Sequence, residues 1–165
     1  TTARGHLETF VKERIAPDTG RSRLVTSDAF AAAWLRFESG TRATVTISVV
    51  AAERRHEITL SGTRGALRVA EQEPLLLSDG SGGAWRPVPV PDELPPSADL
   101  GIPDTDWARN FLRRCRQIAR ALEAGQVTVP GGATFVDGHR NQAVLDAVYR
   151  SSEEARWREV ATTGM

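Results

Sequence analysis

"DAFAAAWLRFESG" (residues 28–40) and "TRATVTISVV" (41–50), which follows it directly, decide the fold of this chain. In the second segment, Ala43, Val45 and Ile47 alternate with threonines, a period of two that is typical of a β-strand. The first segment carries apolar residues on both faces, which favours a buried strand. The Ser39-Gly40 pair separates the two segments with turn-forming residues. The sequence therefore predicts an antiparallel hairpin.

Further short runs on either side of this hairpin have the composition of strands. They are rich in β-branched and apolar residues, and Gly or Pro separates most of them. The predicted strands are 6–11, 56–62, 66–70, 74–78 and 157–160. Such a succession indicates an antiparallel meander, so we expect one sheet of about six strands.

Two segments near the carboxyl end have the period of amphipathic helices. Residues 104–124 place one apolar stripe on a helix, made of Trp107, Phe111, Cys115, Ile118 and Leu122. Residues 136–155 are expected to form the second helix. The prediction is thus an α+β fold, a mostly antiparallel open sheet with two main helices on one face. The other face stays open and is expected to bind a partner.

Composition limits the function. The 165 residues suffice for one domain over 1–165, and the 21 basic residues balance the 21 acidic ones. This balance argues against nucleic acid and anionic membranes as partners. The lone Cys115 forms no internal disulfide, and Cys and His lack zinc-site spacing, so a metal-free cytoplasmic protein is expected. No apolar run has the length of a membrane span.

Residues 78–103 are rich in Gly, Pro and Ser and show no sustained period. They are expected to form an exposed connector, with a lid over a ligand as the alternative.

Three segments in this order resemble the C-terminal domain of the Gfo/Idh/MocA oxidoreductases. "VTSDAFAAAWLRFESGTRATVTIS" (25–48) is similar to the hairpin of that family. "ITLSGTRGALRV" (58–69) is similar to its strand, Gly-Thr-x-Gly turn and returning strand. "FVDGHRNQAVLDAVYRSSEEARWREV" (135–160) is similar to its closing helix and strand.

The resemblance implies a parent oxidoreductase that uses NAD or NADP on a sugar, polyol or related hydroxyl compound. In that family a nucleotide-binding Rossmann domain precedes this one and holds the cofactor on a Gly-rich loop. The nearest candidate here, Gly80–Gly83, has no helix behind it and is expected to be a linker. The lysine of the family's Glu-Lys-Pro motif is missing as well, so the chain alone is expected to bind no cofactor and to be inactive. Its expected roles are to shape the substrate site and to form a homo-oligomer through the open sheet face.

Arg54 is the strongest candidate for a substrate contact. It lies in Glu53-Arg54-Arg55, where related enzymes direct a polar side chain toward the sugar, and its guanidinium suits hydroxyls or a carboxylate. A solvated turn is the alternative. Arg14 and Lys12 are weaker candidates, in another segment that the family brings near the active-site cleft.

Other candidates have simpler structural explanations. The three histidines lack a partner close in sequence, and Cys115 lies on the apolar stripe of a predicted helix. Helix capping and pairing with Arg account for Asp137 and Asp146. Packing accounts for the aromatic residues, with a platform for a sugar ring as an alternative for one of them. These residues are His6, His56 and His139, and Trp34, Trp107, Tyr149 and Trp157.

Two other functions stay open at this point. The chain could be a standalone, non-catalytic module for protein association or carbohydrate binding. The parent enzyme could also keep NAD and the fold while it catalyses a glycosidase-like or hydratase-like net reaction.

Overall fold

A computed structural model describes residues 1–71, 73–80, 84–91 and 94–161 of the chain. The chain divides into two compact units. Unit 1 contains residues 1–52 and the described residues from 133 onward, and unit 2 contains the described residues of 53–132.

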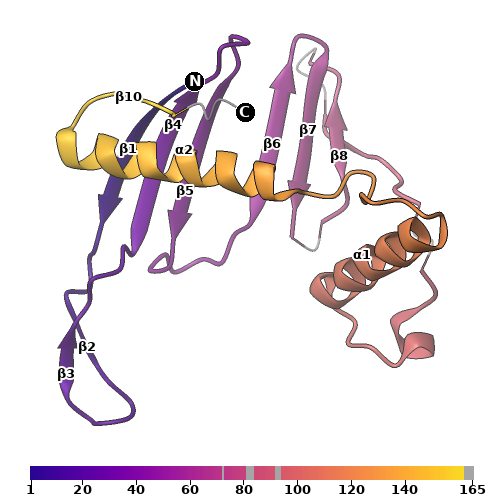
Figure 1. Cartoon of the computed structure of the whole chain (residues 1–165), viewed down its shortest axis with the longest axis horizontal. Helices are drawn as coiled ribbons and strands as arrows, with labels where there is room; N and C mark the ends of the chain where they lie inside the picture. Colours follow the sequence, from indigo (N-terminus) through magenta and orange to yellow (C-terminus); the bar gives the residue numbers. More distant parts are fainter. Residues whose placement is uncertain (72, 81–83, 92–93, 162–165) are drawn as a thin grey trace. The chain divides into compact units, whose positions relative to one another are not determined.

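The centre of unit 1 is a four-stranded antiparallel sheet (Figure 1). Its strand order is β10-β1-β4-β5. The strands are β1 (Thr2–Glu8), β4 (Phe30–Arg36), β5 (Arg42–Ser48) and β10 (Arg158–Glu159). The predicted hairpin is confirmed as β4 and β5, paired from Phe30 opposite Ser48 to Arg36 opposite Arg42.

Helix α2 (Phe135–Glu154) packs along β1 in unit 1 (Figure 1). Its start is fixed by a capping box, in which the backbone N–H of Thr134 donates to the Asp137 carboxylate and the backbone N–H of Asp137 donates to the Thr134 hydroxyl. Small side chains let the helix approach the sheet closely. The buried core is Ala3, Ala33, Ala147 and Val148, surrounded by Leu7, Leu35, Val144 and Val160.

The closest approach between α2 and β1 occurs at Gly5. A Cβ added at Gly5 would collide with the backbone carbonyl of Val148, so only glycine fits there. The backbone N–H of Gly5 donates to the hydroxyl of Ser151 (2.9 Å), and that of Leu7 donates to the hydroxyl of Ser152 (2.9 Å). These two serines give β1 the acceptors that a neighbouring strand would otherwise provide, beyond the point where the short β10 ends.

A small two-stranded sheet lies between β1 and β4 in the sequence. It consists of β2 (Glu13–Ile15) and β3 (Ser22–Leu24), joined by a turn around Pro17-Asp18-Thr19-Gly20. Phe10 leads into this hairpin and lies 6.2 Å from Phe30, measured between ring centroids. The predicted strand 6–11 therefore ends early, because pairing with β4 stops at Glu8.

Unit 2 contains a second four-stranded antiparallel sheet and helix α1. Its strands are β6 (Glu57–Gly62), β7 (Gly65–Ala70), β8 (Leu76–Ser78) and β9 (Arg86–Pro87), in that order. Gly65, with φ of 137°, closes the predicted Gly-Thr-x-Gly turn in a conformation that side chains rarely adopt. A 3₁₀-helix, η1 (Ser97–Leu100), precedes α1 (Asp106–Glu123).

These observations confirm the α+β class with two main helices and antiparallel sheets. The expected number of strands is corrected, because the described residues form ten strands in three sheets where about six strands in one sheet were predicted. The extra strands are only two or three residues long, too short to produce a visible period in the sequence. The connector predicted at 78–103 also contains β9 and η1, and residues 81–83 of the expected linker lie outside the described residues.

Candidate functional site

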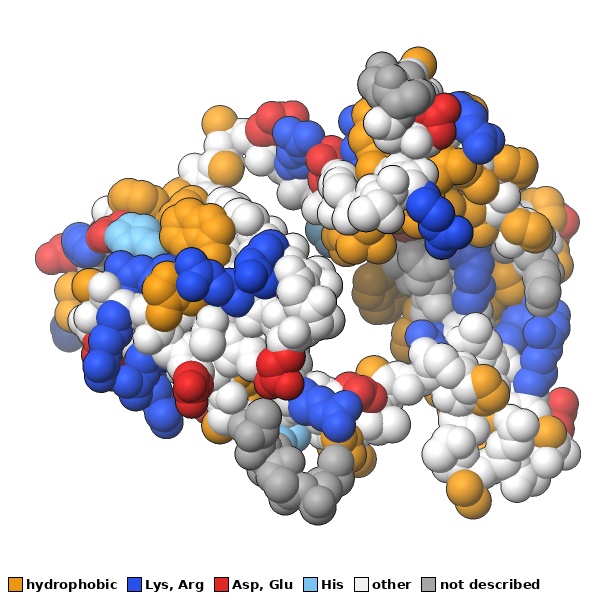
Figure 2. All heavy atoms as spheres, turned by 90° about the horizontal axis from the view of Figure 1, so that it is seen from above, with side chains coloured by type: hydrophobic (Ala, Val, Ile, Leu, Met, Phe, Trp, Pro, Cys, Tyr) orange, Lys and Arg blue, Asp and Glu red, His pale blue; other side chains and the backbone are white. Residues whose placement is uncertain are grey.

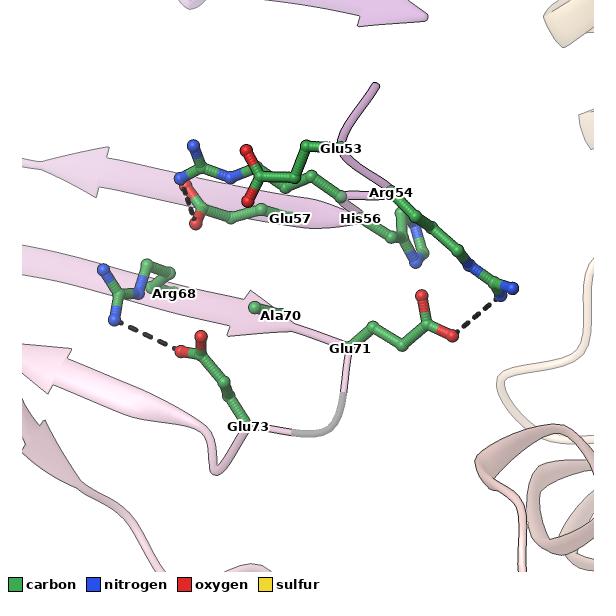
Figure 3. A pocket seen from close by; sticks show the side chains of 9 residues that line it. Glu53, Arg54, His56, Glu57, Arg68, Ala70, Glu71 and Glu73 are labelled. Atoms are coloured by element: carbon green, nitrogen blue, oxygen red, sulfur yellow. Dashed lines mark hydrogen bonds and ion pairs between the residues drawn. The ribbon is translucent and has the colours of Figure 1, made fainter. Parts of the chain in front are cut away.

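A pocket lies in unit 2, at the end of the sheet where β6 begins and β7 ends (Figure 3). It has a volume of about 490 Å³, within the usual size range of small-molecule sites. Its lining is almost entirely charged. The lining residues are Glu53, Arg54, Arg55, His56, Glu57, Arg68, Ala70, Glu71 and Glu73.

The pairing of β6 with β7 brings these residues together. Glu57 lies opposite Ala70, and Thr59 lies opposite Arg68, so the side chains of Glu57 and Arg68 share one face of the sheet. One further hydrogen bond, from the backbone N–H of Glu71 to the carbonyl of His56 (3.0 Å), extends the pairing past the strand ends. The pocket therefore combines the segment before β6 with the turn after β7.

Three ion pairs link the charged side chains of the pocket (Figure 3). Arg54 binds Glu71 at 2.9 Å, Arg55 binds Glu57 at 2.8 Å, and Arg68 binds Glu73 at 3.3 Å. Arg54 and Glu71 lie at one end with His56, and the other two pairs lie at the opposite end with Glu53. The small Ala70 lies between the two ends and leaves space there.

The pocket has an inner wall and an outer rim. The side chains of Glu57, Arg68 and Glu71 are 26%, 30% and 34% exposed, whereas that of Arg54 is 87% exposed. Arg68 also lies against the Trp85 ring, 5.3 Å from its centroid, and its Nε is buried without a hydrogen-bond partner among the described residues. Buried donors normally have an acceptor, so Arg68 is the lining residue whose bonding is least complete.

The pair of Arg55 and Glu57 shifts the pKa of both groups. The hydrogen bond from Arg55 lowers the pKa of the Glu57 carboxyl, and the same bond raises the pKa of the Arg55 guanidinium. Because the pKa of Glu57 is depressed, the pair is intact above the ordinary pKa of a glutamate and is lost only as pH falls through the lowered value. The Arg55–Glu57 pair thus keeps both of its charges at neutral pH.

The structure places the site residues predicted from the sequence in different parts of the chain. Arg54 lines the pocket, together with Glu53 and Arg55 from the same predicted run. Arg68, Glu71 and Glu73 were not predicted from the sequence, because only the strand pairing brings them to this end of the sheet. Among the described residues, no group of His, Cys, Asp and Glu has an arrangement that could hold a metal ion.

Lys12 and Arg14 belong to unit 1, at the β2–β3 hairpin. The Lys12 ammonium pairs with the Glu8 carboxylate at 3.3 Å, and Arg14 lies opposite Arg23. Both side chains are exposed.

No helix in the described part of the chain is long and apolar enough to span a membrane.

The other candidates have mostly structural contacts. Asp137 caps α2, and its pKa is lowered by the hydrogen bonds from Thr134. The Tyr149 hydroxyl donates to Asp28 at 2.6 Å, and Trp157 lies under the guanidinium of Arg36. Cys115 is exposed, contrary to the predicted core position, because the stripe of α1 on which it lies is itself exposed.

Comparison with known proteins finds sequence similarity to one protein family. Residues 1–68 match the model of the GFO/IDH/MocA C-terminal domain. The chain is also similar to the glucose-fructose oxidoreductase domain-containing protein 2 of Xenopus laevis, with 30% identity over 96% of this chain and 44% of that protein.

Solved structures share the fold. An oxidoreductase domain protein from Kribbella flavida superimposes with a TM-score of 0.78 at 26% identity, over 98% of this chain and 44% of that one. A levoglucosan dehydrogenase in complex with NADH gives a TM-score of 0.76 at 20% identity, over 99% and 45% of the two chains. An NAD-binding oxidoreductase from Klebsiella pneumoniae gives 0.76 at 20% identity, over 98% and 46%.

The chain spans less than half the length of these relatives. Its matched segment runs from β1 into β7 and includes the part of the pocket that contains Arg54 and Arg68. By these matches, residues 1–68 resemble the C-terminal domain of the GFO/IDH/MocA family, and the whole chain shares its fold with the solved structures named above.

Proposed function

We propose that this chain is the substrate-side domain of an NAD(P)-dependent oxidoreductase that acts on a sugar, a polyol or a related hydroxyl compound. The observation that carries the proposal is the charged pocket of about 490 Å³ at the β6–β7 end, in a domain whose relatives include oxidoreductases. Arg54 and its neighbours would hold the hydroxyl groups by charge-assisted hydrogen bonds.

The cofactor is expected on a second domain of the same polypeptide, a Rossmann nucleotide-binding domain. The residues described here do not suit a dinucleotide pyrophosphate, which favours a Gly-rich loop at a helix amino terminus. At the start of α2 the Asp137 carboxylate already accepts the Thr134 N–H, and its negative charge would repel a phosphate. At the start of α1 the Thr105 hydroxyl accepts the backbone N–H of Ala108.

The role of the chain in the reaction is to position the substrate. The nicotinamide accepts or donates the hydride, and fixed hydrogen bonds to the other hydroxyls orient the reacting carbon. Arg54 is the main candidate for this task, and Arg14 and Lys12 are further candidates on the β2–β3 hairpin.

Steady-state kinetics of the complete two-domain enzyme would test this function. The absorbance of the reduced nicotinamide is followed while a polyol is varied, and Arg54→Ala is compared with Arg64→Ala, which removes an exposed arginine outside the pocket. We expect Arg54→Ala to lower kcat/KM about ten-fold or more, since it removes a charge-assisted contact. Equal kinetics for the two variants would contradict the assignment of Arg54.

We further propose that the enzyme is a homo-oligomer that uses the sheet face of unit 1 opposite α2. Trp34 on β4 is 47% exposed and shares this face with Phe30, since Ala33 and Leu35 point to the α2 side. Aromatic residues of this kind are enriched in protein interfaces. Sedimentation velocity of Trp34→Arg should show dissociation relative to the unchanged chain, and an unchanged sedimentation coefficient would count against this interface.

A further inference from the structure

The carboxylates in the pocket at the β6–β7 end outnumber its guanidinium groups. Glu53, Glu57, Glu71 and Glu73 face Arg54, Arg55 and Arg68, so the lining has one more carboxylate than it has guanidinium groups. The excess negative charge opposes any ligand that is itself an anion.

Each guanidinium also has an internal carboxylate partner already. The three ion pairs measure 2.9, 2.8 and 3.3 Å and use all three arginines of the lining. An anionic ligand that used the remaining N–H donors of a guanidinium would lie close to the carboxylate already bound there, and the two negative charges would repel each other. At Arg54, the most exposed of the three, that carboxylate is Glu71.

Hydroxyl groups fit this lining without displacing anything. A carboxylate has about four lone-pair sites, and a guanidinium has five N–H donors, so the ion pairs leave acceptors and donors unused. A hydroxyl group can donate to a carboxylate and accept from an N–H at the same time. Paired groups lie at both ends of the pocket with the small Ala70 between them, which suits a molecule with several hydroxyls along its length (Figure 3).

We propose that this pocket selects uncharged polyhydroxyl compounds and rejects their acidic and phosphorylated counterparts, and that Glu71 enforces the selection by occupying Arg54. The inference rests on the proposed function for the choice of pocket. It goes further by naming the charge of the substrate and the residue that sets it.

Titration calorimetry on the 165-residue chain tests the selection with three probes: glucitol, gluconate and glucitol 6-phosphate. For the unchanged chain we expect glucitol to bind at least about five-fold more tightly than either anion, a factor that modest charge repulsion can produce. The difference should shrink with added salt, because screening weakens the repulsion of the anions and leaves glucitol unaffected.

The decisive variant is Glu71→Gln, which keeps the shape of the side chain, removes one negative charge and releases Arg54. The ratio of the gluconate affinity to the glucitol affinity should then rise about five-fold. Glu123→Gln at the end of α1 makes the same charge change outside the pocket and should leave all three affinities unchanged.

Three results would overturn the proposal: gluconate binding to the unchanged chain as tightly as glucitol, Glu71→Gln leaving the ratio of affinities unaltered, or none of the probes binding. The proposed function can fail separately. If the selectivity is found but the complete enzyme transfers no hydride, only the oxidoreductase assignment is lost. If Arg54→Ala impairs hydride transfer but gluconate binds as well as glucitol, only the charge selection is lost.

Discussion

The two long helices of this chain differ in what covers their apolar side chains. In unit 1, α2 packs Ala147 and Val148 against β1, and both side chains are almost fully buried. In unit 2, α1 exposes its apolar stripe, with Trp107, Phe111 and Leu122 at 77%, 61% and 70% exposure. Figure 2 shows hydrophobic side chains at several places on the surface of the chain, some of them next to Lys and Arg.

The polar side of α1 contacts its own chain, and the buried residues of the helix are the small Ala108 and Ala121. Arg109 donates to the carbonyl of Pro95 at 3.1 Å and to the Ser97 hydroxyl at 2.9 Å, which ties the helix to the segment that precedes it. An amphipathic helix normally does the reverse and turns its apolar stripe inward. A clear apolar period therefore predicts a helix, but it does not predict what the apolar stripe of that helix contacts.

The comparison implies that α2 tolerates very little change where it meets β1. Gly5→Ala should lower the free energy of unfolding by at least about 2 kcal/mol, because the added Cβ collides with the backbone carbonyl of Val148. Gly138→Ala on α2 is the control, because the added Cβ enters open space there. This change should raise the free energy of unfolding by about 0.5–1 kcal/mol. Urea unfolding measures both. A Gly5→Ala chain as stable as the original would show that α2 does not pack on β1 as described.

Ser151 should have the next largest effect. It is fully buried, and its hydroxyl accepts from the Gly5 N–H and donates to the Arg156 carbonyl. Ser151→Ala should cost about 1–3 kcal/mol, because the Gly5 N–H loses its acceptor away from water. Ser152→Ala removes a similar bond at a less buried position and should cost less. If urea unfolding gives the same loss of unfolding free energy for both variants, the cost of removing the hydroxyl does not depend on its burial.

The hydrogen bond between Tyr149 and Asp28 should contribute less, since Tyr149 is 53% exposed. Tyr149→Phe is expected to cost about 0.5–1 kcal/mol at neutral pH. The bond to Asp28 raises the pKa of Tyr149 above its ordinary value of about 10. The stabilisation is therefore complete below pH 10 or so and is lost as pH rises through the raised pKa.

Stability measured between about pH 8 and 12 checks this dependence, across the ordinary tyrosine pKa. At the highest pH values, the free energy of unfolding of the original chain should no longer exceed that of Tyr149→Phe. A constant difference between the two chains over the whole range would show that the tyrosine proton is not involved.

The smallest effect is expected on α1. Trp107→Ser should change the free energy of unfolding by no more than about 0.5 kcal/mol, because the side chain is 77% exposed and mainly contacts Phe111 on the same helix. Thermal unfolding checks this directly. A loss above about 2 kcal/mol, the size expected for a core residue, would mean that the stripe is covered in solution and would end the contrast with α2.

Regular periods explain how much of the fold could be predicted. The hairpin of β4 and β5 and both helices were located to within about two residues, because each has an apolar pattern with a clear turn or cap at its end. The β2–β3 hairpin was missed, since Glu13–Ile15 and Ser22–Leu24 are too short to show a period. Only its turn at Pro17-Asp18-Thr19-Gly20 was visible in the sequence.

The candidate site was predicted less completely for a different reason. Arg54 stood out through its place in a family pattern, but its partner Glu71 lies 17 residues away. Which carboxylate meets which guanidinium depends on the register of β6 with β7, where Thr59 falls opposite Arg68. The charge runs on both sides of this predicted hairpin were the available signal, and pairing the hairpin residue by residue would have brought them together.

The claim on which the account depends most is that the pocket between β6 and β7 binds the substrate. Amide chemical-shift mapping of the ¹⁵N-labelled chain during titration with glucitol tests it most directly. The largest shifts are expected on residues 53–57, 68, 70, 71 and 73, and they should vanish in a double variant Arg54→Ala and Glu71→Ala. Shifts confined to other segments, or no shifts at saturating glucitol, would contradict it.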